Sequence, residues 1–275
     1  MVLELISSPI KQQINRTVLE QLESGGHSSA IAKIPSVLDA IYENIPENKR
    51  ISIGRYTTVK TLGEFLYDAL IETGLAVFEI GAAICQSSQD HRGVGVGLSI
   101  LSLYGLEDRE RILPIFETAA KSDHWELREF AQGFFRKVIK KHSQEIHDYL
   151  VNLAKSDDPN LRRFVSETLR PVVENQWLYT DIDYSLSVLR YLFRESHPYP
   201  RTSVGNNLSD IARRNPELVY GLVAELVAMR NKNASWIATR ACRNLVKKDP
   251  IRVMDILNVD EYKYKDKVYK RHEFL

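Results

Sequence analysis

The segment Ala120-Lys-Ser-Asp123, followed by Leu127-Arg128, recurs 34 residues later as Ala154-Lys-Ser-Asp157, followed by Leu161-Arg162. Residues 199–216 hold a third copy, and residues 234–250 hold a fourth. A fixed period of this length is typical of stacked helix pairs, because each pair can bury its apolar face only against its neighbours. The sequence therefore predicts an all-α protein, an α-solenoid.

The composition is that of an ordinary globular chain, with 44% hydrophobic and 27% charged residues among 275. The net charge of +1, from 37 Lys and Arg against 36 Asp and Glu, excludes a globally basic nucleic-acid-binding protein but permits a local basic stripe. Cys85 and Cys242 suit a reducing compartment. No signal peptide and no run of about 18 apolar residues is evident. We therefore expect a cytoplasmic monomer that makes no membrane contact.

We expect one repeat domain over residues 1–275, made of an N-terminal helical cap at 1–56, a repeat stack at 57–258 and a C-terminal tail at 259–275. The predicted helix pairs are 107–121 with 124–140, 143–155 with 159–173, 183–195 with 200–214, and 216–230 with 233–247. Asp123, Asp157 and Asn233 stand where N-caps belong. Residues 51–58 are expected to be a connector. Tyrosine alternates with charge at 261–270, which predicts a solvated helix or tail, with phosphate contact as the alternative.

The second helices of the pairs are expected to form one continuous surface. Arg163, Glu167 and Arg170 follow one another at i, i+4 and i+7, so they share a helical stripe. Glu129 occupies the position of Arg163 one repeat earlier, and Trp125 precedes it by one turn. This pattern has two interpretations, a solvated ladder of alternating charges or a ligand-binding groove.

Other polar and aromatic residues also leave alternatives open. Asn206-Asn207 stands inside a predicted helix, where asparagine is unfavourable, so the pair either joins polar loops or contacts a ligand. Trp177 either caps the core or borders the groove. The spacing of His142 and His147 does not suit a shared metal ion, and we expect no metal site. Residues 93–97, Gly-Val-Gly-Val-Gly, lack the preceding strand that a phosphate-binding glycine loop requires.

Two motifs resemble the AlkC branch of the AlkC/AlkD superfamily of alkylpurine DNA glycosylases. Residues 162–171, Arg-Arg-Phe-Val-Ser-Glu-Thr-Leu-Arg-Pro, are similar to the family's Arg-Arg-Leu-Val-Ser-Glu-Gly-Thr-Arg-Pro. Residues 200–211, from Pro-Arg-Thr-Ser to Asn-Asn-Leu-Ser-Asp-Ile, are similar to its Val-Arg-Arg-Ser-Val-Ala-Asn-Asn-Leu-Asn-Asp-Ile. The resemblance covers about residues 75–250. It implies a stack of HEAT-like helix pairs, of the right-handed type, with a concave groove for duplex DNA.

Not every family position is matched. A second family glutamate aligns with His124, and an arginine of the second motif is replaced by Thr202. In the AlkD branch, the motif Trp-Trp-Asp-x-Val-Asp supplies a tryptophan and a catalytic aspartate. Trp125 falls on that tryptophan, and Glu129 falls on the aspartate with one more methylene.

The resemblance implies DNA alkylation repair by release of N3- or N7-alkylated purines from double-stranded DNA, without a cofactor and without flipping the base into a deep pocket. A carboxylate would activate water and stabilise the sugar cation, and an aromatic side chain would contact the cationic lesion. We expect the protein to be nucleoid-associated. Arg163→Ala is expected to weaken DNA binding and its salt dependence. The alternatives are a non-catalytic protein that binds damaged or branched DNA and a HEAT scaffold that binds proteins.

The candidate site residues fall into three groups. The catalytic candidates are Glu129, Glu167 and Trp125. The DNA-binding candidates are Arg128, Arg162, Arg163, Arg170, Arg201, Ser203, Asn206 and Asn207. Three further candidates are His124, Trp177 and Arg240.

Overall fold

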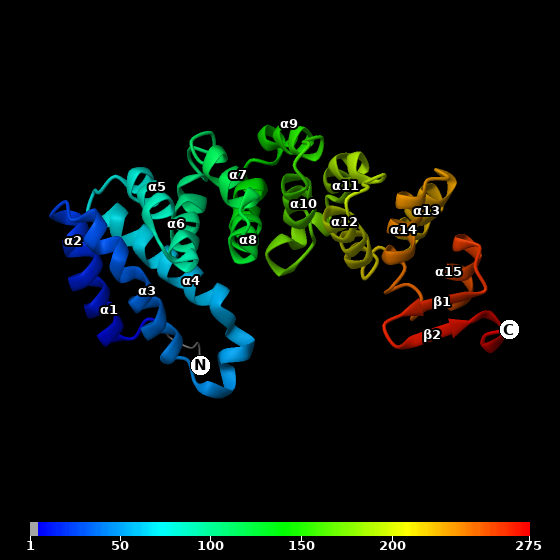
Figure 1. The fold of residues 1–275 in the computed structure, drawn as a ribbon, viewed down its shortest axis with the longest axis horizontal. Helices are drawn as coiled ribbons and strands as arrows, with labels where there is room; N and C mark the ends of the chain where they lie inside the picture. The colour runs from blue at the N-terminus through cyan, green and yellow to red at the C-terminus, as the bar shows by residue number, and fades with distance from the viewer. Residues whose placement is uncertain (1–4) are drawn as a thin grey trace. The chain divides into compact units, whose positions relative to one another are not determined.

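The computed structural model describes residues 5–275, and it is helical except for a short C-terminal hairpin (Figure 1). The prediction of an all-α chain is confirmed. Backbone contacts divide the chain into an N-terminal unit that ends at Lys141 and a C-terminal unit from His142 to Leu275. Each unit is described by itself, and the single domain over 1–275 stays a prediction. Within the described residues, no helix combines the length and the apolar character that a membrane span requires.

The described part of the N-terminal unit consists of helices joined by loops. They are α1 (Ser8–Ile14), a π-helical turn (Asn15–Leu19), α2 (Glu20–Glu23), α3 (His27–Glu43), α4 (Glu47–Glu72), α5 (Val77–Ser87), α6 (His91–Tyr104), α7 (Leu113–Lys121) and α8 (Trp125–Lys141). Helix α6 lies at the centre of this unit and packs against α4, α5 and α8.

Helix α6 contains the glycine run of residues 93–97, so the run is not a phosphate-binding loop. A methyl group at Gly95 would lie 2.8 Å from the Phe130 ring of α8 and 2.9 Å from Val59 of α4. The absence of a side chain at Gly95 therefore allows α6 to approach its neighbours closely.

The expected connector at 51–58 is wrong, because these residues belong to α4. The helix is broken at Gly54, whose φ of 65° is readily adopted only by glycine. On the N-terminal side of this break, Arg50 donates hydrogen bonds to the carbonyl groups of Ile45 and Glu43.

The C-terminal unit contains three of the four predicted helix pairs, and the first pair is α7 with α8 of the N-terminal unit. Its elements are α9 (Ser143–Ala154), α10 (Pro159–Thr168), a 3-10 segment (Val173–Tyr179), α11 (Ile182–Leu189) with a 3-10 turn (Arg190–Leu192), α12 (Pro198–Ile211), α13 (Pro216–Ala228), α14 (Lys232–Ala241), α15 (Pro250–Leu257), β1 (Glu261–Tyr264), β2 (Lys267–Lys270) and a 3-10 turn (Arg271–Glu273). The second helices α10, α12 and α14 pack side by side in that order.

Two of the predicted N-caps are wrong by one or two residues. Asp158, not Asp157, accepts a hydrogen bond from the amide of Asn160 at the start of α10. Asn231, not Asn233, caps α14. A cap is defined by the residue at which the backbone turns helical, and a run of neighbouring polar residues does not fix that point.

The predicted solvated helix or tail at 261–270 is also wrong, because these residues form an antiparallel hairpin. Tyr262 pairs with Tyr269, both side chains are buried, and the Tyr262 hydroxyl donates to the carbonyl of Thr239 in α14 at 2.6 Å. The alternation of tyrosine with charge is the period of a strand with one buried face.

Candidate nucleic-acid interface

Arg163 and Glu167 of the predicted stripe lie on α10 of the C-terminal unit, and Arg170 lies two residues beyond the end of this helix. All three side chains contact residues of α12. The Glu167 side chain is buried, and it accepts hydrogen bonds from the Ser203 hydroxyl at 2.6 Å and from Arg170 Nη1 at 2.8 Å. Arg163 Nη2 lies 3.9 Å from the same carboxylate. These contacts join the two motifs, and they hold Glu167 between cations.

The two arginines determine the protonation of Glu167. Burial alone would raise the pKa of this carboxyl group. The charges of Arg170 and Arg163, and the hydrogen bonds from Arg170 and Ser203, outweigh burial and lower the pKa below its usual range. Glu167 is therefore an ionised but enclosed carboxylate.

Arg170 also reaches Asp210 of α12, a carboxylate that was not among the predicted site residues. Its Nη2 and Nε atoms lie 2.6 and 3.1 Å from Asp210 Oδ2. Arg213 and Arg243 lie 3.3 and 3.8 Å from the other oxygen of Asp210. Asp210 is 6% exposed, and this buried acid is neutralised by three arginines, each of which lies two residues beyond the end of α10, α12 or α14.

The same pattern continues between α12 and α14. Asn206 Oδ1 accepts hydrogen bonds from Arg240 Nε at 2.8 Å and from Arg243 Nη1 at 2.6 Å. Asn207 is fully buried and donates to the carbonyl of Ser166 at 2.8 Å. Both asparagines therefore bind neighbouring repeats, which accounts for their position inside a helix.

Aromatic and cationic side chains lie together beside the contact between α12 and α14. Arg201 places its guanidinium 4.6 Å from the ring centre of Trp236, and its Nη1 donates to Asn233 at 2.8 Å. Trp236 is 36% exposed. A hollow here is lined by Trp236, Arg240 and Arg243 of the α14 region, together with Lys263 and Tyr264 of β1. The hollow combines aromatic and cationic groups, which is a combination that suits a nucleic-acid strand.

Arg163 is largely enclosed. Its guanidinium lies 4.4 Å from the ring centre of Tyr199, and its side chain is 11% exposed. Its role as a phosphate contact stays a prediction.

The N-terminal unit holds the other carboxylate and aromatic candidates at the start of α8. Trp125 is the first residue of the helix and is 60% exposed. Glu129 follows one turn later, is half-buried, and accepts a hydrogen bond from Gln132 at 2.5 Å. His124 precedes the helix, and its ring stacks on His91 with 4.0 Å between ring centres.

Arg128 and Arg162 make the same contacts in successive repeats. Arg128 Nη1 donates to the carbonyls of Ser122 and Asp123 at 2.6 and 2.9 Å. Arg162 Nη1 donates to the carbonyls of Ser156 and Asp157 at 2.7 and 2.9 Å, and Arg162 also pairs with Glu195. These bonds explain the repeated Ser-Asp and Leu-Arg pattern, since each arginine closes the loop before its own helix.

Trp177 packs against neighbouring side chains, which favours the interpretation that it caps the core. Its indole Nε1 donates to Asn175 at 3.2 Å, and its ring lies 5.5 Å from the ring of Tyr184, measured between centres.

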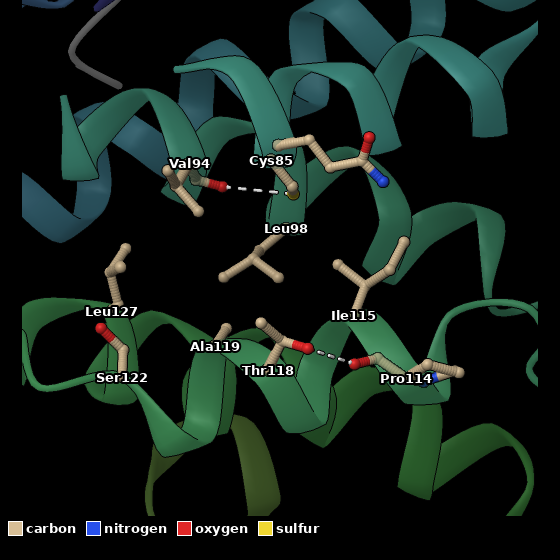
Figure 2. Close-up of a pocket in the computed structure, with 10 residues that line it drawn as sticks. Cys85, Val94, Leu98, Pro114, Ile115, Thr118, Ala119, Ser122 and Leu127 are labelled. Atoms are coloured by element: carbon tan, nitrogen blue, oxygen red, sulfur yellow. Dashed lines mark hydrogen bonds between the residues drawn. The ribbon is translucent and has the colours of Figure 1, made fainter. Parts of the chain in front are cut away.

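A pocket in the N-terminal unit is unsuited to nucleic acid. It has a volume of about 630 Å³ and is lined mostly by apolar side chains of α5, α6 and α7 (Figure 2). Its polar groups bond internally, with Thr118 donating to the carbonyl of Pro114 at 2.9 Å. Burial raises the pKa of the Cys85 thiol, which disfavours the thiolate. No charged residue lines this pocket.

Comparisons with known proteins agree with this architecture. The family model described as DNA alkylation repair enzyme matches residues 84–245. The uncharacterised protein YhaZ of Bacillus subtilis is 28% identical over 151 residues, which is 53% of this chain and 40% of that protein. The match therefore spans less than half of that relative's length.

Two solved structures share the fold. An alkylpurine DNA glycosylase AlkC from Pseudomonas fluorescens, bound to DNA with an abasic site analogue, superposes with a TM-score of 0.59 and 19% identity, over 90% of this chain and 68% of that one. AlkD2 from Streptococcus mutans superposes with a TM-score of 0.54 and 18% identity, over 67% of this chain and 89% of that one. The predicted resemblance to the AlkC/AlkD superfamily is confirmed at the level of the fold.

Proposed function

This chain belongs to the DNA alkylation repair enzyme family, and from that premise we propose that it is a glycosylase that releases N3- or N7-alkylated purines from duplex DNA. The observation that carries the proposal is the pair formed by Trp125 and Glu129. An exposed indole and a half-buried carboxylate stand one turn apart on α8, inside the segment that matches the family.

The chemistry requires little beyond this pair. The alkylated base carries a positive charge, so the bond from C1′ of the sugar to the base nitrogen breaks with its electrons moving to the base, which leaves neutral. A carboxylate stabilises the sugar cation that develops and accepts a proton from the water that attacks C1′. The indole face contacts the cationic base.

Glu129 suits this role better than Glu167. The Glu167 carboxylate is 4% exposed and is already occupied by Arg170 and Ser203. It cannot approach a sugar in bound DNA without breaking those contacts. Its arrangement supports a role in holding α10 and α12 together, with Arg170 and Asp210.

The proposed DNA contacts come from the accessible cations and from Trp236. Arg201, Arg240 and Arg243 surround this indole, and phosphate groups bind to arginine side chains of this kind. Arg163 contributes positive charge from an enclosed position, and Arg170 contributes it while bound to Glu167 and Asp210.

The test is base release from duplex DNA methylated with dimethyl sulfate, with the freed purines separated by chromatography. Wild-type protein should release methylated purines, and Glu129→Gln should reduce the rate by about 10²–10⁴-fold without loss of DNA affinity. Glu145→Gln, an exposed carboxylate on α9, is the matched control and should be unchanged. Loss of release in a folded Glu167→Gln protein, with Glu129→Gln active, would reverse the assignment.

A non-catalytic DNA-binding protein is the second candidate, because the set of carboxylates differs from that of the family. His124 stands where the family has a glutamate, and Glu167 is enclosed. Glu129 is therefore the accessible carboxylate among the catalytic candidates. It predicts DNA binding that weakens with salt, and no base release from any methylated substrate. A protein-binding scaffold predicts neither release nor DNA binding.

A further inference from the structure

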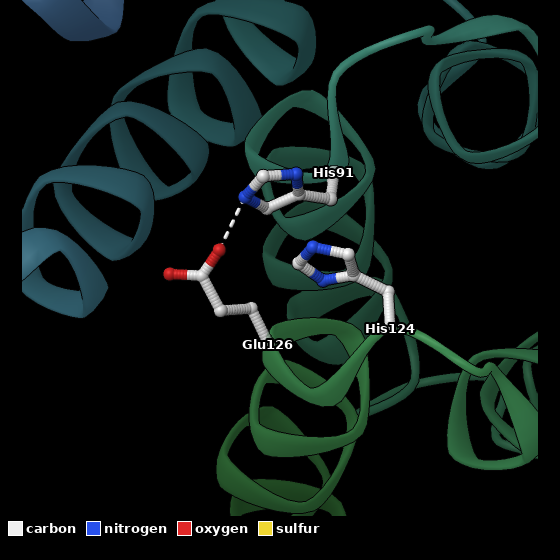
Figure 3. Close-up of side chains that lie close together, drawn as sticks. All are labelled: His91, His124 and Glu126. Atoms are coloured by element: carbon white, nitrogen blue, oxygen red, sulfur yellow. Dashed lines mark ion pairs between the residues drawn. The ribbon is translucent and has the colours of Figure 1, made fainter.

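Three potential metal ligands meet at the edge of α6 and α8 in the N-terminal unit (Figure 3). His91 is the first residue of α6, His124 lies in the loop before α8, and Glu126 lies in the first turn of α8. One ligand atom from each side chain lies within 4.8 Å of the other two. Among the described residues, this is the one group of at least three histidine, cysteine or carboxylate side chains with such spacing.

One nitrogen of this cluster, His91 Nε2, makes no ordinary hydrogen bond. His91 Nε2 contacts Glu126 Oε2, yet the geometry is not that of a hydrogen bond, and this nitrogen is buried without another hydrogen-bond partner in the described chain. The His91 and His124 rings stack with an angle of 23° between their planes. Two imidazoles and a carboxylate therefore lie together, and one buried ring nitrogen has the Glu126 carboxylate as its polar contact.

The positions of these side chains are fixed by packing one turn further along both helices. Gly95 of α6 lies against Phe130 of α8, and each is four residues beyond His91 and Glu126, respectively. Asp90 caps α6 and binds Arg92, which fixes the helix start. Close packing at this contact brings His91 and Glu126 to the same level on neighbouring helices.

We propose, against the expectation from the sequence of no metal site, that His91, His124 and Glu126 bind one divalent transition-metal ion, with Zn²⁺ as the ion of choice. Two imidazole nitrogens and one carboxylate oxygen are a zinc ligand set that leaves a further position for water or another ligand. Calcium and magnesium favour sites made of oxygen atoms, so they should bind weakly here. The neighbouring Trp125 is exposed, which places the open side of the site at the protein surface.

The proposal does not depend on glycosylase activity, and its test is direct binding. Protein without a histidine tag, freed of metal by a chelator, is titrated with ZnCl₂ in a calorimeter. Wild-type protein should bind one ion. His124→Ala and Glu126→Gln should each weaken binding by more than about 10-fold, since loss of even an outer-shell partner costs ~10–100-fold in metal affinity. His147→Ala, whose ring contacts Ser187 in the C-terminal unit, is the matched control.

A second measurement uses wild-type protein alone, in case a variant fails to fold. Long-range proton–nitrogen NMR spectra report each imidazole nitrogen, and Zn²⁺ should shift the ring signals of two histidines and leave the other five unchanged. Addition of excess MgCl₂ should shift neither. The absence of saturable zinc binding, or zinc shifts confined to other histidines, would overturn the proposal and leave a plain contact between imidazole and carboxylate.

Discussion

Glu167 shows how a carboxylate with a lowered pKa ties stability to pH. A group whose pKa is lower in the folded state binds fewer protons there than in the unfolded chain. Its stabilising contribution is therefore complete above the unfolded pKa of about 4.3, and it is lost as the pH falls through the lower folded pKa. Wild-type protein should lose stability below about pH 5 partly through this group.

The corresponding prediction concerns Glu167→Gln. The amide cannot neutralise Arg170, so unfolding at pH 7 should require about 3 kcal/mol less free energy than in the wild type. Because the variant lacks the titrating group, its stability should also fall less steeply with acid. Urea unfolding between pH 7 and pH 3 measures both effects. Glu145→Gln controls for the loss of a charge, and equal acid sensitivity in wild type and Glu167→Gln would contradict the assignment.

Sequence spacing predicts neighbours on one helix but not partners on the next. The i, i+4 spacing correctly pairs Arg163 with Glu167 on α10, and Arg170 contacts Glu167 from beyond the end of the helix. Their partners Ser203 and Asp210 lie 36 and 40 residues away along the chain, and helix spacing says nothing about such contacts. An aspartate flanked by apolar residues in a predicted repeat helix, as Asp210 is by Leu208 and Ile211, is a usable signal, because a buried acid needs a cation.

The histidine cluster illustrates the same limit. His142 and His147 are close in sequence, and their spacing gives no reason to expect a shared metal ion. His91 and His124 are 33 residues apart, and only the packing of α6 on α8 brings their rings together. A search for ligands by local spacing would therefore miss them.

At the scale of elements, the packing of α6 makes a specific prediction for glycine. Gly95→Ala adds a methyl group 2.8 Å from the Phe130 ring and 2.9 Å from Val59, both of which are buried. We expect it to lower the free energy of unfolding by about 1–3 kcal/mol, despite the higher helix propensity of alanine.

Gly221 in α13 is the matched control. No atom lies within 4 Å of a methyl group at this position, so Gly221→Ala should stabilise the protein by about 0.5–1 kcal/mol. Urea unfolding of both variants measures the difference. Equal changes in the free energy of unfolding for the two substitutions would mean that stability does not depend on the close approach of α6 to α4 and α8.

The sequence predicts the repeat helices well and the C-terminal hairpin poorly, and the difference has physical reasons. Apolar spacing and proline fix where the repeat helices begin, as Pro216 does at the start of α13. The sequence 261–270 has the period of a strand, but a two-residue turn at Lys265-Asp266 lacks the glycine that marks many hairpins. Packing of the buried tyrosines against α14 decides the outcome, and it is a tertiary effect.

For the whole molecule, the net charge of +1 means that DNA affinity must come from local cations. Each phosphate contact contributes about one to the slope of log affinity against log salt concentration. Arg201→Ala should weaken binding of duplex DNA and reduce this slope by about 1. Fluorescence anisotropy at several salt concentrations measures both quantities.

Arg190→Ala is the control for that experiment, because Arg190 follows a first helix and pairs with Glu225 instead. It should change neither the affinity nor the slope. Arg163→Ala was expected from the sequence to act like Arg201→Ala, and its 11% exposed side chain favours a smaller change. An unchanged slope in Arg201→Ala would remove Arg201 from the proposed DNA surface.

The hairpin has a consequence for self-association. β1 and β2 pair only with each other, so each strand keeps one edge on which a strand from another molecule can add. Lys263, Lys267 and Lys270 stand exposed on these strands, and Lys265 stands exposed in the turn. Repulsion between the lysines of two molecules opposes pairing of their strand edges, and high salt concentrations screen this repulsion. Concentrated solutions at high ionic strength should therefore be where copies of this protein begin to aggregate, starting from the hairpin.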